Sequence, residues 1–126
     1  MGLVLDTGGL IAFDRGDRQV AALLEAARRK RERVVTSSGS VAQAWRGGGS
    51  RHALLARLLR GATEVALDRR ISRATGDLCA TSKTTDVVDA HVALIALDGD
   101  VVLTSDVSDL RRLLRARGVR GQVLRC

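Results

Sequence analysis

Two short apolar runs in this sequence end in an aspartate, Asp6 and Asp106, and a third acid, Asp89, opens a strongly apolar segment. Asp86 precedes Asp89 by three residues, so the two share one face if this segment is helical. In open α/β sheets, binding sites form outside the carboxyl ends of the strands. We therefore expect Asp6, Asp89 and Asp106 to converge if the first and fourth apolar runs are neighbouring strands.

Such convergence requires a counter-ion, because two unit charges about 4 Å apart repel by roughly 4 kcal/mol at an effective dielectric constant of 20. Hard oxygen ligands in a chain with only two histidines favour Mg²⁺ or Mn²⁺ over zinc. A carboxylate-held divalent cation polarises a phosphoryl oxygen and lowers the pKa of a bound water. The acids therefore indicate phosphodiester hydrolysis.

Helix capping offers a structural alternative for most of these acids. Asp86 can be an N-cap with Asp89 in the first turn of its helix, and Asp106 can cap the last helix with Asp109 in its first turn. Asp6 has no such role if Thr7 caps the following helix, which favours a functional interpretation of Asp6.

Apolar runs and helical periodicities alternate along the chain. Short, wholly apolar strands are typical of parallel sheets, which are buried on both faces. The pattern predicts a single domain over residues 1–126, a three-layer α/β fold with a central, mainly parallel sheet of four to five strands flanked by helices. The expected strands cover residues 2–5, 33–37, 64–67, 101–103 and 122–124. The expected helices cover residues 10–14, a segment capped by Asp17, segments opening at Ser38 or Ser40 and at Ser50, and residues 68–82, 86–97 and 107–117.

The composition is basic, with 21 Lys and Arg against 14 Asp and Glu and a net charge of +7. A pI near 11 is typical of proteins that bind polyanions, and the basic residues gather at 28–33, 46–60, 69–73 and 111–125. No apolar run approaches the roughly 20 residues of a membrane span, and the N-terminal residues do not resemble a signal peptide. The two cysteines form no metal or redox motif, which predicts reduced thiols in a cytoplasmic protein.

The chain resembles the PIN-domain family, specifically the VapC-type ribonuclease toxins of bacterial toxin–antitoxin modules. The resemblance spans essentially the whole chain and rests on residues 4–7, 89–93 and 102–106, with Asp109 following. It implies that Asp6, Asp89 and Asp106 are catalytic and bind Mg²⁺ or Mn²⁺, and that Thr7 braces the carboxylate of Asp6. The same resemblance implies cleavage of RNA, a homodimer and inhibition by a VapB-like antitoxin, while the lack of a membrane-length apolar run predicts no membrane association.

Further residues enter the expected site around these acids. Asp86 is a candidate additional metal ligand. A second group is expected to support the acids or contact the substrate: Thr7, Gln43, Thr104, Ser105, Asp109 and Arg46.

One position departs from the family pattern, because Gln43 stands where the family carries a Glu. An amide oxygen can ligate a cation, but it brings no charge and cannot act as a base. We therefore expect weaker metal binding, and the alternative function is a catalytically weak or inactive PIN-fold module that binds RNA. A receiver-type phosphoryl-transfer domain ranks last, since neither lysine follows a predicted strand.

Three other side chains receive predictions from their surroundings in the sequence. Trp45 is expected to pack in the core, with a substrate groove shared with Arg46 as the alternative. His52 is predicted to lie on the surface, and His91 to be a partly buried structural residue. Residues 47–49, all glycine, are expected to be a flexible connection between helices.

Overall fold

The computed structural model describes residues 1–126 and is organised around five parallel strands in the order β3-β2-β1-β4-β5. The strands are β1 (Leu3–Leu5), β2 (Val34–Ser37), β3 (Thr63–Val65), β4 (Val101–Thr104) and β5 (Gln122–Arg125). β1 occupies the centre, with Leu5 opposite Thr36 on β2 and Leu103 on β4. The first and fourth strands are therefore neighbours, which is the condition under which Asp6, Asp89 and Asp106 are expected to converge.

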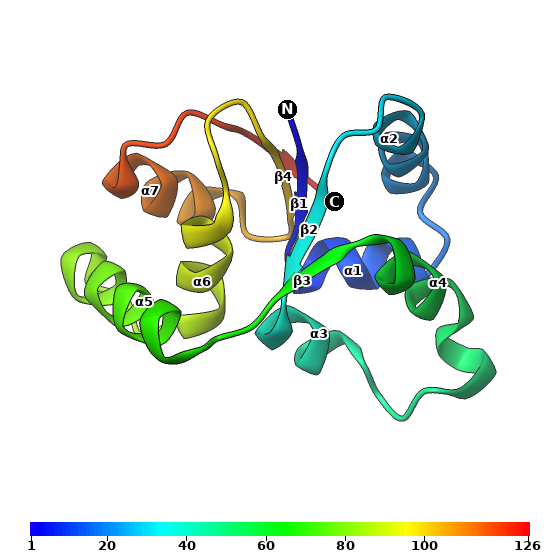
Figure 1. Cartoon of the computed structure of the whole chain (residues 1–126), viewed down its shortest axis with the longest axis horizontal. Coiled ribbons are helices and arrows are strands. Elements are labelled where there is room, and N and C mark those ends of the chain that lie inside the picture. The colour runs from blue at the N-terminus through cyan, green and yellow to red at the C-terminus, as the bar shows by residue number, and fades with distance from the viewer.

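Helices cover both faces of the sheet, so the predicted three-layer fold is confirmed (Figure 1). One layer holds α1 (Thr7–Asp14), α2 (Arg18–Arg29) and α4 (Ala53–Gly61), which a short 3₁₀ helix η1 (Gly49–His52) precedes. The other layer holds α5 (Arg69–Ser82), α6 (Val87–Ile95) and α7 (Val107–Arg117), while α3 (Ser38–Ala44) lies near one end of the sheet. None of these helices has the length and apolar character needed to cross a membrane.

Alternation along the central strands divides the core into two halves. Val4 and Val102 pack with the residues of α5, α6 and α7, whereas Leu5 and Leu103 pack with α1, α2 and α4. These four side chains are buried almost completely. The sheet is therefore apolar on both faces, so polar side chains that could do chemistry are expected at the ends of its strands.

The structure differs from the expected elements mainly at their ends. The first helix begins at Thr7 rather than residue 10, because the side chain of Asp6 caps it. The third strand covers residues 63–65 rather than 64–67, and it lies at the edge of the sheet with a single partner strand. The segment expected to begin at Ser50 starts as the 3₁₀ helix η1 before α4.

Candidate metal centre

Asp6 and Asp106 come together because β1 and β4 are neighbouring parallel strands. Thr104 joins the two: its Oγ1 donates a hydrogen bond to Asp6 Oδ2 and accepts one from the Asp106 backbone N–H (2.8 Å). Asp6 Oδ1 accepts from the Gly9 N–H (2.9 Å), and the residue is only 4% exposed. Both oxygens of Asp6 are thus oriented by the fold.

Two expectations about the surroundings of Asp6 are wrong. Asp6 is itself the N-cap of α1, so a capping role does not fall to Thr7. Thr7 Oγ1 instead donates to Gln43 Oε1 (2.5 Å), and the hydroxyl that braces Asp6 belongs to Thr104. A carboxylate oxygen that accepts one hydrogen bond retains a second lone pair, so these contacts leave Asp6 able to bind a cation.

Asp89, Asp106 and Asp109 form the tightest acidic cluster of the molecule. Each offers one carboxylate oxygen, and these oxygens lie within 4.8 Å of one another. Asp106 occupies the N-cap position of α7, but its side chain makes no capping hydrogen bond. Asp86 does cap its helix, since its Oδ1 accepts from the Asp89 N–H (2.9 Å). The capping alternative thus holds for Asp86 and does not account for the carboxylate of Asp106.

The cluster brings several carboxyl groups together with little positive charge nearby. Burial raises the pKa of Asp89 to about 7, with further contributions from Asp86, Asp106, Asp6 and Asp109, in that order. Burial also raises the pKa of Asp6 and of Asp106, and in Asp106 a hydrogen bond with Asp109 adds to the effect.

The nearest cation in the chain is Arg112, whose Nη2 lies 3.8 Å from Asp109 Oδ1. One guanidinium at this distance does not balance the converging carboxylates. The donor set consists only of hard oxygens, as Mg²⁺ and Mn²⁺ prefer, and it therefore fits the expected cation.

The remaining predicted residues lie around this cluster without joining it. Gln43 is exposed on α3, where its amide oxygen accepts from Thr7, and Arg46 is exposed just beyond α3. Ser105 is exposed and faces the start of α1, where a Cβ atom on Gly8 would lie 2.5 Å from its Oγ. That contact explains the glycine in a helical turn.

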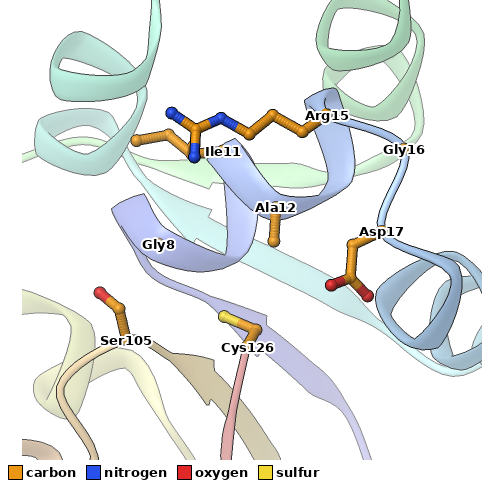
Figure 2. Close-up of a pocket in the computed structure, with 8 residues that line it drawn as sticks. All are labelled: Gly8, Ile11, Ala12, Arg15, Gly16, Asp17, Ser105 and Cys126. Carbon is orange, nitrogen blue, oxygen red and sulfur yellow. The ribbon is translucent and has the colours of Figure 1, made fainter.

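A cavity of about 510 Å³ opens beside Ser105 (Figure 2). Cys126 lies between Ser105 and Asp17 in this view, and the guanidinium of Arg15 extends away from them on the far side of α1. Asp17 is its only acidic lining residue, so none of the acids of the carboxylate cluster lines the cavity. Its lining comprises Gly8, Ile11, Ala12, Arg15, Gly16, Asp17, Ser105 and Cys126.

Two predictions beside the site are wrong. His52 is buried rather than superficial, because its Nδ1 pairs with Asp14 Oδ2 (2.6 Å) and its Nε2 accepts from the Arg46 N–H (3.0 Å). Trp45 is 38% exposed rather than part of the core, and its ring stacks on that of His52. Sequence reasoning missed the Asp14–His52 pair, since 38 residues separate its members and no motif connects them.

His91 lies in α6 as expected, but it is fully rather than partly buried, with no hydrogen-bond partner for its Nε2. Burial lowers the pKa of His91, so the neutral ring is favoured.

Comparison with known proteins gives matches among solved structures. No protein-family model and no curated protein matches this chain. Among solved structures, the chain is similar to one in the crystal structure of VapBC2 from Rickettsia felis bound to a DNA fragment from their promoter. The TM-score is 0.68 at 12% sequence identity, and the match covers 98% of this chain and 99% of that chain. At this identity the similarity shows the fold alone, and that fold is the PIN-like three-layer α/β architecture described above.

Proposed function

We propose that this chain is a Mg²⁺- or Mn²⁺-dependent endoribonuclease, the toxin of a type II toxin–antitoxin module. The observation that carries the proposal is the cluster of Asp89, Asp106 and Asp109, whose oxygens lie within 4.8 Å of one another in a VapC-type PIN fold. Asp6 lies close enough to raise the pKa of Asp89, so four acids share this edge of the sheet.

Each acid has a distinct part in the proposed site. Asp89, Asp106 and Asp109 would hold the cation together with Asp6, and Asp86 adds negative charge next to them. When bound, the cation supplies electrophilic polarisation of the phosphoryl oxygen and lowers the pKa of a water. Asp89 must lose its proton before it can serve as a ligand. Its pKa of about 7 means that this costs little near neutral pH.

Neighbouring residues position the acids and the RNA. Thr104 fixes the orientation of the Asp6 carboxylate through its hydroxyl, and its link to the Asp106 backbone couples the two strand ends. Arg46, exposed beyond α3, contributes a guanidinium suited to a phosphate. Gln43 is held by Thr7 and offers an amide in place of a further carboxylate.

The proposal extends to partners and location. The similar solved structure is a VapBC2 complex, which supports a VapB-like antitoxin as the partner of this chain. We expect a homodimer in the cytoplasm. A net charge of +7 is consistent with RNA as the substrate.

Gln43 supports a second candidate, a PIN-fold module that binds RNA and cleaves it weakly or not at all. Its exposed amide accepts the hydroxyl of Thr7 and adds no charge to the cation site. This candidate predicts RNA affinity with little metal-dependent turnover.

Cleavage of total RNA by the purified chain, free of antitoxin, tests both candidates in Mg²⁺, Mn²⁺ and EDTA. Asp89→Asn removes a ligand, and Asp77→Asn is the matched control on the exposed face of α5. Discrete fragments that require metal, persist in Asp77→Asn and vanish in Asp89→Asn support the nuclease. If RNA binds but no metal produces fragments, the second candidate replaces the first.

A further inference from the structure

We propose that the indole of Trp45 is a stacking platform for one unpaired base of the RNA substrate. This inference rests on the proposed function and adds a residue that determines how substrate is held. The chain has a single Trp, a single Phe and no Tyr, and Phe13 is half-buried against the core, so Trp45 is the exposed aromatic ring of the molecule.

The Trp45 ring is held in a fixed orientation while part of it remains exposed. One contact is with the His52 ring, at a centroid distance of 5.3 Å and an interplanar angle of 24°. Another is with Gly48, where a Cβ atom would lie 3.0 Å from Trp45 Cζ2 and where φ is +69°. A residue other than glycine would be strained there and would crowd the indole. A large apolar side chain that is oriented yet 38% exposed is suited to contact with a ligand.

His52, which supports the indole, is itself fixed at both ring nitrogens. Its Nε2 accepts from the Arg46 N–H, so the ring proton is on Nδ1 and is donated to Asp14 Oδ2. Asp14 Oδ1 accepts from the Leu55 N–H (3.1 Å), which ties this group to α4. Buried polar contacts between α1 and α4 thus support the exposed ring, which preorganises it for binding.

The surroundings of the indole favour a nucleotide over a protein segment. Residues 46–60 include four arginines and no Asp or Glu, and Arg46 and Arg51 are exposed on either side of the glycine run. An aromatic face beside guanidinium groups offers contacts for both parts of a nucleotide, the base and the phosphate. Trp45 also follows Gln43 by two residues, and Gln43 contacts Thr7, the neighbour of Asp6. The platform therefore adjoins the acidic edge of the sheet.

Intrinsic fluorescence tests the proposal directly, since Trp45 is the only tryptophan. The wild-type chain in EDTA is titrated with a short single-stranded RNA and with an abasic oligonucleotide of the same length and charge. We expect the RNA to quench Trp45 strongly and the abasic strand to quench it weakly. Equal quenching by the two strands would show that the ring does not stack on a base and would overturn the proposal.

Affinity for a labelled RNA of the same sequence gives the second measurement, in EDTA so that cleavage does not intervene. We expect Trp45→Ala to weaken binding about tenfold and Trp45→Phe to retain most of the affinity, since stacking needs an aromatic face. Leu97→Ala, which removes another exposed apolar side chain, is the matched control and should bind like wild type. Thermal melts establish that the variants are folded.

These binding measurements separate this inference from the proposed function. Asp89→Asn should still be quenched more strongly by the RNA than by the abasic strand even though it does not cleave, and Asp77→Asn should bind, quench and cleave like wild type. If the wild-type chain binds RNA but fails to cleave it, the nuclease is wrong and the platform stands. If Trp45→Ala leaves RNA affinity unchanged, or weakens only the binding of a protein partner, the platform is wrong while the nuclease stands.

Discussion

At the scale of single residues, the most informative group is the carboxyl of Asp89, whose pKa is raised to about 7 by burial and by four neighbouring acids. In the unfolded chain this carboxyl has its ordinary pKa of 3.8. Between pH 3.8 and about pH 7, Asp89 is therefore protonated in the folded state and ionised in the unfolded state. The contribution of Asp89 to stability is therefore complete below about pH 4 and is lost as the pH rises through about 7.

We accordingly expect the melting temperature of the metal-free protein to fall between about pH 5 and pH 8, by a few degrees from this group. Asp89→Asn should fall less over the same range and be more stable than wild type at about pH 8, because it cannot become charged. Circular dichroism melts in EDTA provide the measurement. Asp77→Asn should keep the wild-type slope, and parallel curves for wild type and Asp89→Asn would contradict this account.

Residue types pointed to the acids, and they pointed to Thr104 only as one of six residues expected to support the acids or contact the substrate. Asp6, Asp89 and Asp106 stand out in the sequence because each adjoins an apolar element. That Thr104 rather than Thr7 braces Asp6 follows from the pairing of β1 with β4, which joins residues 98 apart. A hydrogen bond over such a separation depends on tertiary geometry, which local sequence does not encode.

At the scale of elements, Arg117 of α7 caps the C-terminal end of α6. Arg117 Nη1 donates to the carbonyl oxygens of Ala93 and Ala96, at 2.8 Å each, where α6 ends. The last carbonyls of a helix have no partner within it, so these bonds satisfy groups that would otherwise be unpaired. The basic residues at 111–125 indicated a surface for a polyanion, yet Arg117 serves the packing of two helices.

Replacing Arg117 should therefore destabilise the fold. We expect Arg117→Ala to lower the free energy of unfolding by about 1–3 kcal/mol, since it removes charged donors from two carbonyls. Arg115→Ala, at an exposed position of the same helix, should change it by less than about 0.5 kcal/mol. Urea unfolding followed by circular dichroism compares the two, and equal effects would rule out the capping role.

Helices were easier to predict than the edge of the sheet. The expected helix over residues 107–117 is confirmed residue for residue, and Asp17 caps α2 through the Val20 N–H as expected. Caps and periodicity are local signals, so the sequence carries them directly. The limits of β3 depend on its single neighbour β2, and the register of such a pair is a tertiary property.

At the scale of the whole molecule, charge is divided between an acidic edge and a basic remainder. Five acids surround the candidate cation site, while residues 33–63 carry arginine and no acid. A polyanion thus meets repulsion at the site unless a cation is bound, and attraction beside it. The arginines can therefore attract RNA even when no metal is bound.

RNA affinity in EDTA should consequently fall steeply with salt, because each neutralised phosphate of a single strand contributes about −0.7 to the log–log slope. We expect the double change of Arg46→Ala and Arg51→Ala to reduce the magnitude of this slope by about 1 to 1.5. Arg28→Ala is the matched control, since this guanidinium already pairs with Glu25 (2.7 Å). Fluorescence anisotropy across a salt series measures the slopes, and an unchanged slope in the double variant would exclude this segment from the RNA contact.

The central position of β1 determines when the site can assemble during synthesis of the chain. β1 is made first, but its neighbour β4 and the residues that follow it are made about a hundred residues later. Until Thr104 emerges from the ribosome, Asp6 lacks its brace and the acids of α6 and α7 have no edge on which to meet. The fold therefore delays assembly of the site until β4 has been made. A growing chain that stops before β4 contains Asp6 but lacks Asp106 and Asp109, so it has no metal centre.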